Sequence, residues 1–401
     1  MSNFIFISPN FPKTYYQFPQ AWKQMGNCAL GIGDEPWDCL SSPLKDALDE
    51  YYQVSNMEDY EEMYRAVAWL AHRHGRIDWL ESNNEYWLEQ DARLRTDFNI
   101  SSGDKTDTVM RFKTKSNMKA YYAKAGCPVA KWHLVTNLKE GQAFIKEVGF
   151  PVVIKPDNGV GAGGTWKLSD EEDLRAFYET DLRVPYIMEE YVPGYIQSFD
   201  GLTDQNGKII FKTSHIFPKP IMDIVLSKGE CWYYNVREIP EDLNRIGTKV
   251  IRSFALKGRF FHAEFFRLSQ DKAGLGKKGE LVGLEVNMRP PGGYTTDMMN
   301  FAADHDIYRE YAQMAAGHPI MMPPKNPYHC VYVGKRSALR YKHSTTDIYR
   351  AYGASICMHE AMPLILQNDM GDDAYIARFK TLTEVEKFVR FVYEKQSDKK
   401  G

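Results

Sequence analysis

Short apolar runs alternate with longer segments of helical periodicity in the first part of the chain. Residues 4–7 form an apolar run that ends at a Ser-Pro-Asn turn, and residues 77–80 form another. Apolar positions spaced three and four residues apart predict helices over 57–74 and 84–95. Strands that alternate with helices are typical of a parallel α/β sheet, whose ligands bind at the carboxyl ends of the strands. We therefore predict an α/β unit over 1–110.

A glycine-rich loop lies between two strand-like runs in the middle of the chain. The loop covers 157–164, and the runs cover 151–155 and 165–168. Directly afterwards, Ser169 and Glu172 have the spacing of a capping box, which predicts that a helix begins there. The pattern of this region is therefore strand, glycine loop, strand and helix.

Two hairpins are predicted in the second half of the chain. The dipeptide Asn206-Gly207 separates two strand-like runs, which is a strong hairpin signal. A polar, glycine-rich loop separates a run at 260–268 from one at 280–289. Beyond a double proline the pattern shifts to short apolar runs and a closing helix at about 383–394, which predicts a small β-rich C-terminal segment.

The glycine loop can bind phosphate, because residues without a Cβ leave the backbone N–H groups accessible. Its glycines are Gly159, Gly161, Gly163 and Gly164. Their spacing matches the dinucleotide fingerprint, but that fingerprint requires a helix directly after the loop. A strand-like run follows here, so we predict a glycine flap between antiparallel strands; a plain flexible turn is the alternative. Lys155 ends the preceding strand, where it is either a phosphate contact or a solvated lysine.

The second hairpin carries the most informative polar residues of the chain. Side chains alternate along a strand, so Glu285, Asn287 and Arg289 share one face. If Glu264 lies across the hairpin on that face, two carboxylates and an amide oxygen converge. Hard oxygen ligands of this kind suit Mg²⁺ that also binds ATP phosphates, and Arg289 could hold a phosphoryl group or a carboxylate. An ordinary hairpin with a salt bridge between Arg289 and a glutamate is the alternative.

Charge and composition exclude some classes of partner. The formal net charge is −3, and no run of five or more basic residues exists, so neither nucleic acid nor an anionic membrane is an expected partner. No apolar run approaches the ~18 residues of a membrane span, and the N-terminus lacks the pattern of a signal peptide. The six cysteines form no C-x-x-C pair, which favours reduced thiols. We expect a cytoplasmic protein.

Taken in order, these motifs resemble the ATP-grasp family, specifically its carboxylate–amine ligase branch. The resemblance covers roughly 76–320, and the order of the motifs is its specific part. The matching motifs are Lys115-x-x-Met118, Val153-Ile154-Lys155-Pro156 with the glycine loop, Glu189-Glu190-Tyr191-Val192, Glu264, and Glu285-x-Asn287-x-Arg289 followed by Gly292-Gly293. Biotin carboxylases of this family carry a Gln-Val-Glu-His run after the arginine, whereas Pro290-Pro291-Gly292-Gly293 here resembles the amino-acid ligases.

The resemblance implies a Rossmann-like N-terminal domain, a two-lobed ATP-grasp domain and a small β-rich C-terminal segment. The implied boundaries are 1–110 for the N-terminal domain, 111–190 for the small lobe with the flap, 191–325 for the large lobe with the metal site, and 326–401 for the C-terminal subdomain. It also implies roles for single residues. ATP would be bound by Lys115, Lys155, Gly161, Gly163, Gly164, Glu189, Glu190 and Val192, and Mg²⁺, or Mn²⁺ instead, by Glu264, Glu285 and Asn287. Arg289 and Lys155 would be the catalytic residues, and Lys113 and Lys119 are neighbouring alternatives to Lys115.

The function implied by the resemblance is an ATP-dependent carboxylate–amine ligase. It would form an amide or peptide bond between small molecules through an acyl phosphate and release ADP and phosphate. A biotin-carboxylase-like enzyme or a phosphotransferase of the same family is the alternative. A nicotinamide-dependent oxidoreductase ranks last, because no helix pattern follows the glycine loop. A homodimer is one assembly that this family permits.

Overall fold

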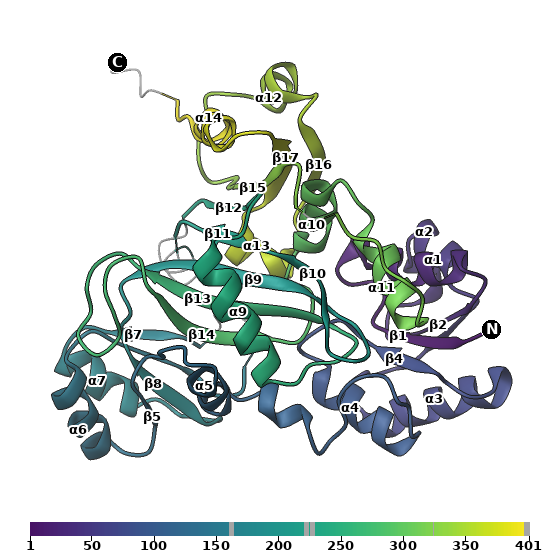
Figure 1. The fold of residues 1–401 in the computed structure, drawn as a ribbon, viewed down its shortest axis with the longest axis horizontal. Coiled ribbons are helices and arrows are strands. Elements are labelled where there is room, and N and C mark those ends of the chain that lie inside the picture. The colour runs from purple at the N-terminus through teal and green to yellow at the C-terminus, as the bar shows by residue number, and fades with distance from the viewer. Residues whose placement is uncertain (160–163, 220–223, 225–228, 324, 397–401) are drawn as a thin grey trace.

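The first unit of the computed structural model is a parallel sheet of four strands in the order β3-β2-β1-β4 (Figure 1). The structure describes residues 1–159, 164–219, 224, 229–323 and 325–396. The strands are β1 (Asn3–Ile7), β2 (Cys28–Gly33), β3 (Glu50–Gln53) and β4 (Trp79–Glu81). All three strand pairs are parallel, which confirms the predicted α/β class of this unit.

Helices cover the faces of this sheet, and local signals determine where they begin and end. They are α1 (Gln17–Gln24), α2 (Ser42–Ala47), α3 (Tyr60–His74) and α4 (Leu88–Asp97). Helix α3 begins after Asp59, whose side chain accepts a hydrogen bond from the N–H of Glu61 at 2.9 Å. It ends at Gly75, whose φ of 86° favours glycine. The helix predicted over 57–74 is therefore confirmed, although it begins at Tyr60 and not at residue 57.

A small antiparallel sheet carries the glycine loop. Its strands, in the order β5-β8-β6-β7, are β5 (Trp132–Leu134), β6 (Val152–Pro156), β7 (Trp166–Leu168) and β8 (Tyr186–Glu190). The helices of this region are α5 (Lys115–Lys124), α6 (Leu138–Val148) and α7 (Glu171–Tyr178). Strands β6 and β7 pair antiparallel on either side of the loop. The predicted antiparallel strands on either side of the loop are confirmed, and the element after the loop is the strand β7, whereas the dinucleotide fingerprint requires a helix there.

The capping box predicted at Ser169 is wrong by one residue. Helix α7 has Asp170 as its N-cap, and the Asp170 carboxylate accepts hydrogen bonds from the N–H groups of Glu172 and Asp173 at 2.9 Å each. The Asp173 side chain accepts in turn from the N–H of Ser169 at 2.7 Å. An aspartate and a serine both cap well, so neighbouring candidates compete for this position.

A large antiparallel sheet forms the centre of the molecule (Figure 1). Its strands are β9 (Gly194–Thr203), β10 (Ile209–Thr213), β11 (His215–Phe217), β12 (Cys231–Asn235), β13 (Phe260–Leu268), β14 (Leu281–Asn287), β15 (His329–Lys335), β16 (Ile356–Ala361) and β17 (Asp373–Phe379). Both predicted hairpins are confirmed, as β9–β10 and β13–β14. Strand β12 pairs with β15 along its length, so the C-terminal strands continue the same sheet.

Helices around the large sheet link it to the first unit. They are α9 (Glu241–Ser253), α10 (Thr295–Ala303), α11 (Ile307–Ala315), α12 (Thr345–Tyr352), α13 (Leu364–Met370) and α14 (Leu382–Tyr393). An aromatic cluster joins the two parts: the ring of Phe18 on α1 lies 6.0 Å from Phe260 on β13 and 5.1 Å from Tyr311 on α11. This shared core fixes the first unit against the large sheet, so residues of both can contribute to one site.

The aromatic residues Phe217 and Tyr233 pack together next to α10. Tyr233 is buried, stacks on Phe217 with ring centroids 4.7 Å apart, and shares a hydrogen bond with the hydroxyl of Thr295 at 2.9 Å. In the part of the chain that the structure describes, no helix is long and apolar enough to cross a membrane.

Candidate active site

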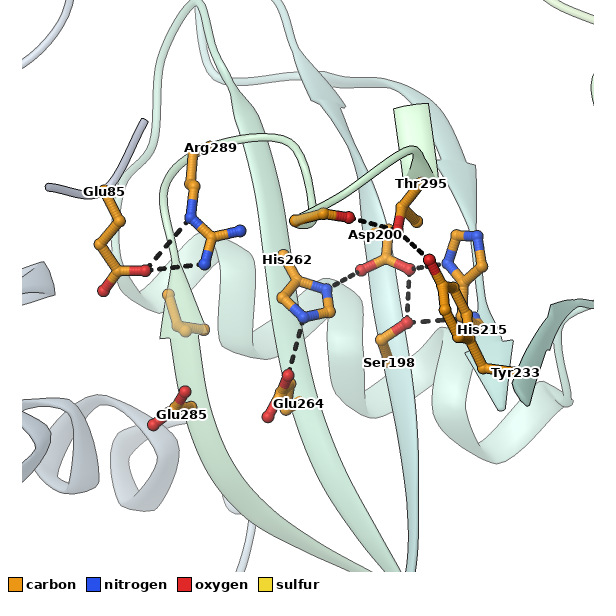
Figure 2. A network of polar contacts seen from close by, with 12 residues as sticks. Glu85, Ser198, Asp200, His215, Tyr233, His262, Glu264, Glu285, Arg289 and Thr295 are labelled. Atoms are coloured by element: carbon orange, nitrogen blue, oxygen red, sulfur yellow. Dashed lines mark hydrogen bonds and ion pairs between the residues drawn. The ribbon is translucent and has the colours of Figure 1, made fainter. Parts of the chain in front are cut away.

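The hairpin of β13 and β14 brings Glu264 and Glu285 to one face of the large sheet (Figure 2). His262 pairs with Asn287, and the register then shifts between Ala263 and Phe265. The shift sets Glu264 opposite two residues of β14, one of which is Glu285, as in a β-bulge. The side chains of Glu264 and Glu285 are 18% and 22% exposed, so both carboxylates are accessible from solvent. The predicted convergence of these two residues is therefore present.

Cationic side chains surround the two carboxylates. Lys115 Nζ lies 3.9 Å from Glu285 Oε2, and His262 Nε2 lies 2.8 Å from Glu264 Oε1. Burial would raise the pKa of Glu285, but Lys115 and Lys155 outweigh it and hold the pKa below its usual value. Burial would lower the pKa of His262, but Asp200 and Glu264 raise it to about 10. Glu285 is therefore anionic and His262 cationic near neutral pH.

The oxygen ligands present fit a magnesium ion that is shared with a nucleotide. Mg²⁺ in such sites is bound by one or two carboxylates together with phosphate oxygens and water, without a cage of protein ligands. Among the described residues, no group of three or more His, Cys, Asp or Glu side chains could hold a metal ion. Glu264 and Glu285 supply two carboxylates, which is the number of protein ligands expected when phosphate oxygens and water complete the shell of Mg²⁺.

Asn287, the third predicted metal ligand, turns its amide toward Glu85. With the amide nitrogen placed toward the Glu85 carboxylate, it donates to Glu85 Oε1 at 2.8 Å. The amide oxygen then faces away from Glu85 and remains available as an oxygen ligand. The role of Asn287 at a metal ion stays a prediction.

Lys115 connects the glycine loop to the carboxylate pair. Its Nζ donates to the carbonyl of Gly159 at 3.0 Å, and its own N–H donates to the carbonyl of Asp157 at 2.9 Å. The Asp157 carboxylate also accepts from Ser116, so the start of α5 is tied to the start of the loop. Gly164 ends the described part of the loop with a φ of 71°. Gly161 and Gly163, which we expected to bind phosphate, lie outside the described residues.

A buried cluster of charges joins β6, β8 and α5. Glu189 Oε2 forms an ion pair with Lys155 Nζ at 2.7 Å, and Glu189 Oε1 contacts Lys119 Nζ. Burial raises the pKa of Glu189, but the two lysines outweigh it and bring the pKa down to about 2. Lys119 was predicted only as an alternative to Lys115. The structure places it against Glu189 on β8, which is the strand where we expected the adenine contacts.

The neighbours of Glu189 on the expected adenine segment are also engaged or buried. Glu190 Oε1 accepts from the N–H of Lys131 at 2.7 Å, and its other oxygen lies 3.5 Å from Lys272 Nζ. Val192 is buried in a small apolar cluster. The side chains of this segment therefore secure β8 and the residues after it within the protein, and the contacts with adenine stay a prediction.

Arg289 forms an ion pair with Glu85, a residue that the sequence analysis did not identify. Its Nη2 and Nε lie 2.9 and 3.2 Å from Glu85 Oε2, and its Nη1 donates to the carbonyl of Pro290 at 2.9 Å. Glu85 is buried, which raises the pKa of its carboxyl. It lies in the loop after β4 of the first unit, so it reaches the site from a distant part of the sequence (Figure 2). No local pattern around Glu85 indicates this partner.

The predicted site residues thus come from the small antiparallel sheet, the large sheet and α5, and they lie around the carboxylate pair of Glu264 and Glu285. Lys115, Lys155, Glu264 and Glu285 interact electrostatically. Arg289 lies two residues beyond Asn287, where β14 has ended. Antiparallel strands on either side of a glycine loop, buried lysines and a carboxylate pair on a second sheet are the features that the resemblance to the ATP-grasp family predicts.

Comparisons with known proteins agree with this class. Residues 114–197 match the sequence model of the carbamoyl-phosphate synthase L chain, ATP binding domain. The N-terminal section of the carbamoyl phosphate synthase large chain of Methanopyrus kandleri is 30% identical over 113 residues, which cover 27% of this chain. The matched region spans only 20% of the length of that relative.

Two solved structures match nearly the whole chain. The L-amino acid ligase of Bacillus licheniformis has a TM-score of 0.73 at 14% identity and covers 98% of this chain and 97% of its own. The biotin carboxylase domain dimer of the Hydrogenobacter thermophilus 2-oxoglutarate carboxylase, in complex with MgADP, ADP and bicarbonate, has a TM-score of 0.72 at 16% identity and covers 98% and 89%. This chain therefore shares the fold of these two enzymes over nearly its whole length, and its residues 114–197 are similar to an ATP-binding domain.

Proposed function

We propose that this protein is a Mg·ATP-dependent carboxylate–amine ligase that forms an amide or peptide bond through an acyl phosphate. The observation that carries the proposal is the carboxylate pair of Glu264 and Glu285 on one sheet face (Figure 2). Lys115 and Lys155 interact electrostatically with Glu285. The likeness of the whole fold to an L-amino acid ligase supports the same reaction class. Fold alone does not determine the reaction, so the choice of substrates is part of the proposal.

The reaction has two steps. A carboxylate oxygen of the acid attacks the γ-phosphorus of ATP, the bond to the β-phosphate oxygen breaks, and ADP leaves. The amine nitrogen then attacks the acyl carbon, the bond to the phosphate oxygen breaks, and phosphate leaves while the nitrogen loses a proton. Catalysis of such steps consists mainly of positioning and charge neutralisation.

The residues of this chain have separate tasks in that scheme. Lys115 and Lys155 bind the phosphates, and the flap excludes water from an intermediate that hydrolyses easily. Glu264, Glu285 and Asn287 would hold Mg²⁺, or Mn²⁺ instead, which neutralises phosphate charge when bound. Arg289 binds the acid or the transferring phosphoryl group once Glu85 shares or releases its guanidinium.

The turn after Arg289 is suited to meeting the acyl group. Gly293 has a φ of 63°, and a Cβ on Gly292 would meet no atom within 4 Å, so the backbone there is open to a ligand. Its N–H groups are candidates for binding the oxyanion of the tetrahedral intermediate. A cytoplasmic location and a homodimer belong to this proposal, the latter because one similar domain is described as a dimer.

The test is a hydroxamate assay across amino, keto and fatty acids. With Mg·ATP, the correct acid and hydroxylamine, an acyl hydroxamate should form together with ADP in bicarbonate-free buffer. Arg289→Lys should lose most of this activity, because a point charge does not replace the planar fork of the guanidinium. Arg309→Lys, an exposed change on α11, is the control.

Two outcomes would overturn the proposal. Turnover that requires bicarbonate and biotin would identify a biotin-carboxylase-like enzyme. A phosphorylated product that is stable to hydroxylamine would identify a phosphotransferase of the same fold.

A further inference from the structure

A line of buried hydrogen bonds runs from Glu264 into the interior of the large sheet (Figure 2). His262 lies between two carboxylates: its Nε2 is 2.8 Å from Glu264 Oε1, and its Nδ1 is 2.5 Å from Asp200 Oδ1. A carboxylate oxygen without a proton only accepts hydrogen bonds, so both ring nitrogens of His262 donate. One imidazole thus connects an accessible carboxylate to a fully buried one.

Asp200 is fixed by hydrogen bonds from Ser198 and His215, and it therefore fixes the orientation of the His262 ring. It is fully buried on β9, and its Oδ2 accepts from the hydroxyl of Ser198 and from Nδ1 of His215, the latter at 2.6 Å. His215 Nε2 in turn accepts from the side-chain amide of Asn235 at 3.1 Å. The line therefore ends in side chains from three adjacent strands, and rotation of the His262 ring would break both of its hydrogen bonds.

The line of hydrogen bonds ends at the surface, because the carboxylate of Glu264 is partly exposed. Glu264 lies opposite the register shift in β14, and its backbone stays in register with β9. Its carboxylate is partly exposed beside Glu285, so without a partner it would sample several rotamers. The bond from His262 limits the carboxylate to one orientation and occupies one of its two oxygens.

We propose that His262, oriented by Asp200, is a positioning residue that holds the Glu264 carboxylate ready for the divalent cation of the nucleotide complex. This inference rests on the proposed function, because it takes Glu264 as a ligand of that cation. Groups that orient metal ligands typically change metal affinity by about 10–100-fold when they are removed. His262 itself is not a ligand, because both of its nitrogens are occupied as donors.

Two isosteric substitutions separate the two bonds of the ring. Asn places an amide near the position of Nδ1, so His262→Asn keeps a donor toward Asp200 and loses the one toward Glu264. Gln places its amide near the position of Nε2, so His262→Gln keeps the donor toward Glu264. The readout is direct binding of Mn²⁺ in the presence of ADP, followed by the electron paramagnetic resonance signal of free Mn²⁺, which needs no acid or amine substrate.

We expect His262→Asn to weaken Mn²⁺ binding by roughly 10-fold or more, while His262→Gln stays close to the wild type. Thermal unfolding of each variant checks that the fold persists. His305→Asn and His305→Gln are matched controls, because His305 Nε2 forms the same contact with Glu310 Oε1 at 2.8 Å away from this site. Equal Mn²⁺ affinity in the two His262 variants would refute the positioning role.

A further variant separates this inference from the proposed function. Glu264→Gln should weaken Mn²⁺ binding at least as much as His262→Asn does. If Glu264→Gln has no effect, the proposed metal site itself is wrong. If Glu264→Gln weakens binding and His262→Asn does not, only the role of His262 is wrong.

Discussion

At the scale of single residues, the charge of Glu285 is the property that matters most for the proposed reaction. The carboxylate is held anionic by Lys115 and Lys155 and faces the expected nucleotide phosphates. Glu285→Gln keeps the shape and removes the charge, so turnover should fall on the order of 10²-fold or more while the fold persists. Steady-state ADP release measures this, and Glu280→Gln on the exposed loop before β14 is the control. Near-normal turnover would mean that Glu285 holds no metal ion.

Asp297 offers a second residue-level prediction, on stability and pH. This buried carboxylate of α10 accepts hydrogen bonds from Thr14, Gln17 and Tyr308 at 2.8, 3.0 and 3.1 Å. Burial is the larger influence and raises the pKa from 3.8 to about 6. The protonated group therefore adds stability that is fully present below about pH 4 and is lost as the pH rises through about 6.

The loss should amount to about 2 kcal/mol between pH 4 and 7, since one pKa unit corresponds to about 1.4 kcal/mol and part of the effect lies below pH 4. Asp297→Asn removes the titrating group, so its unfolding temperature relative to the wild type should rise between these two pH values. Calorimetry at each pH measures the difference, with exposed Asp107→Asn as the control. A difference that stays constant with pH would show that Asp297 does not titrate in this range.

Sequence reasoning at this scale succeeded where a local rule applied. The two-residue period of a strand placed Glu285 and Asn287 on one face, and the hairpin brought Glu264 to it. Arg289, which was predicted on the same strand, lies beyond its end. It missed Glu85, because the contact between Glu85 and Arg289 is made between residues far apart in the chain. The line from His262 to Asp200 was also missed, although the spacing of His262 and Glu264 on one strand face was visible.

At the scale of elements, the packing of α5 against β14 fixes the hairpin that bears the carboxylates. A Cβ on Gly283 would lie 2.1 Å from Cδ1 of the buried Tyr122 ring. The Tyr122 hydroxyl donates to the carbonyls of Glu264 and Glu285 at 3.1 and 2.6 Å, one on each strand. The helix therefore sets the spacing of the two strands at the carboxylate pair.

Gly283→Ala should destabilise the protein by about 1–3 kcal/mol, because a well-packed core does not accept an added methyl group. It should also lower turnover, since displacement of Tyr122 moves both carboxylates. Unfolding temperature and ADP release measure the two effects. Tyr122→Phe is the matched variant, because it removes the hydroxyl and leaves the ring; if Gly283→Ala is as stable and active as the wild type, the contact is not tight.

The elements themselves were predicted unevenly. Long periodic helices such as α3 and hairpins with clear turn residues were predicted correctly. Helices α10 and α11 were not identified. Helix α10 is buried on several sides, so its polar and apolar positions do not separate cleanly. The shared sheet of β12 and β15 could not be predicted either, since strand pairing between distant segments leaves no local signal.

At the scale of the whole molecule, a buried charge cluster joins the first unit to the large sheet. Glu81 Oε2, at the end of β4, accepts from Arg95 Nη2 at 2.8 Å and from Arg259 Nη2 on the large-sheet side at 2.5 Å. Asp104 adds a contact to Arg259 at 3.2 Å. All of these side chains are buried. Neutralising Glu81 would remove the carboxylate that both buried guanidinium groups share.

Glu81→Gln should therefore cost about 3–5 kcal/mol, the range for breaking a buried ion pair by removing one side. Calorimetry should show a lower unfolding temperature, with the first unit separating from the large sheet first. Glu147→Gln, which breaks the exposed pair of Glu147 with Lys131, should change stability by at most about 1 kcal/mol. Equal effects of the two substitutions would contradict the special role of the buried cluster.

The pairing of β12 with β15 bears on how the chain matures during translation. Strands β9 to β14 emerge from the ribosome well before β15 to β17, yet the sheet is closed on the β12 side only when β15 arrives. Until then the backbone of β12 is an open edge, and open edges recruit strands from other chains. Slow synthesis after residue 325 should therefore favour aggregation of nascent chains, and early arrival of the last strands should protect them.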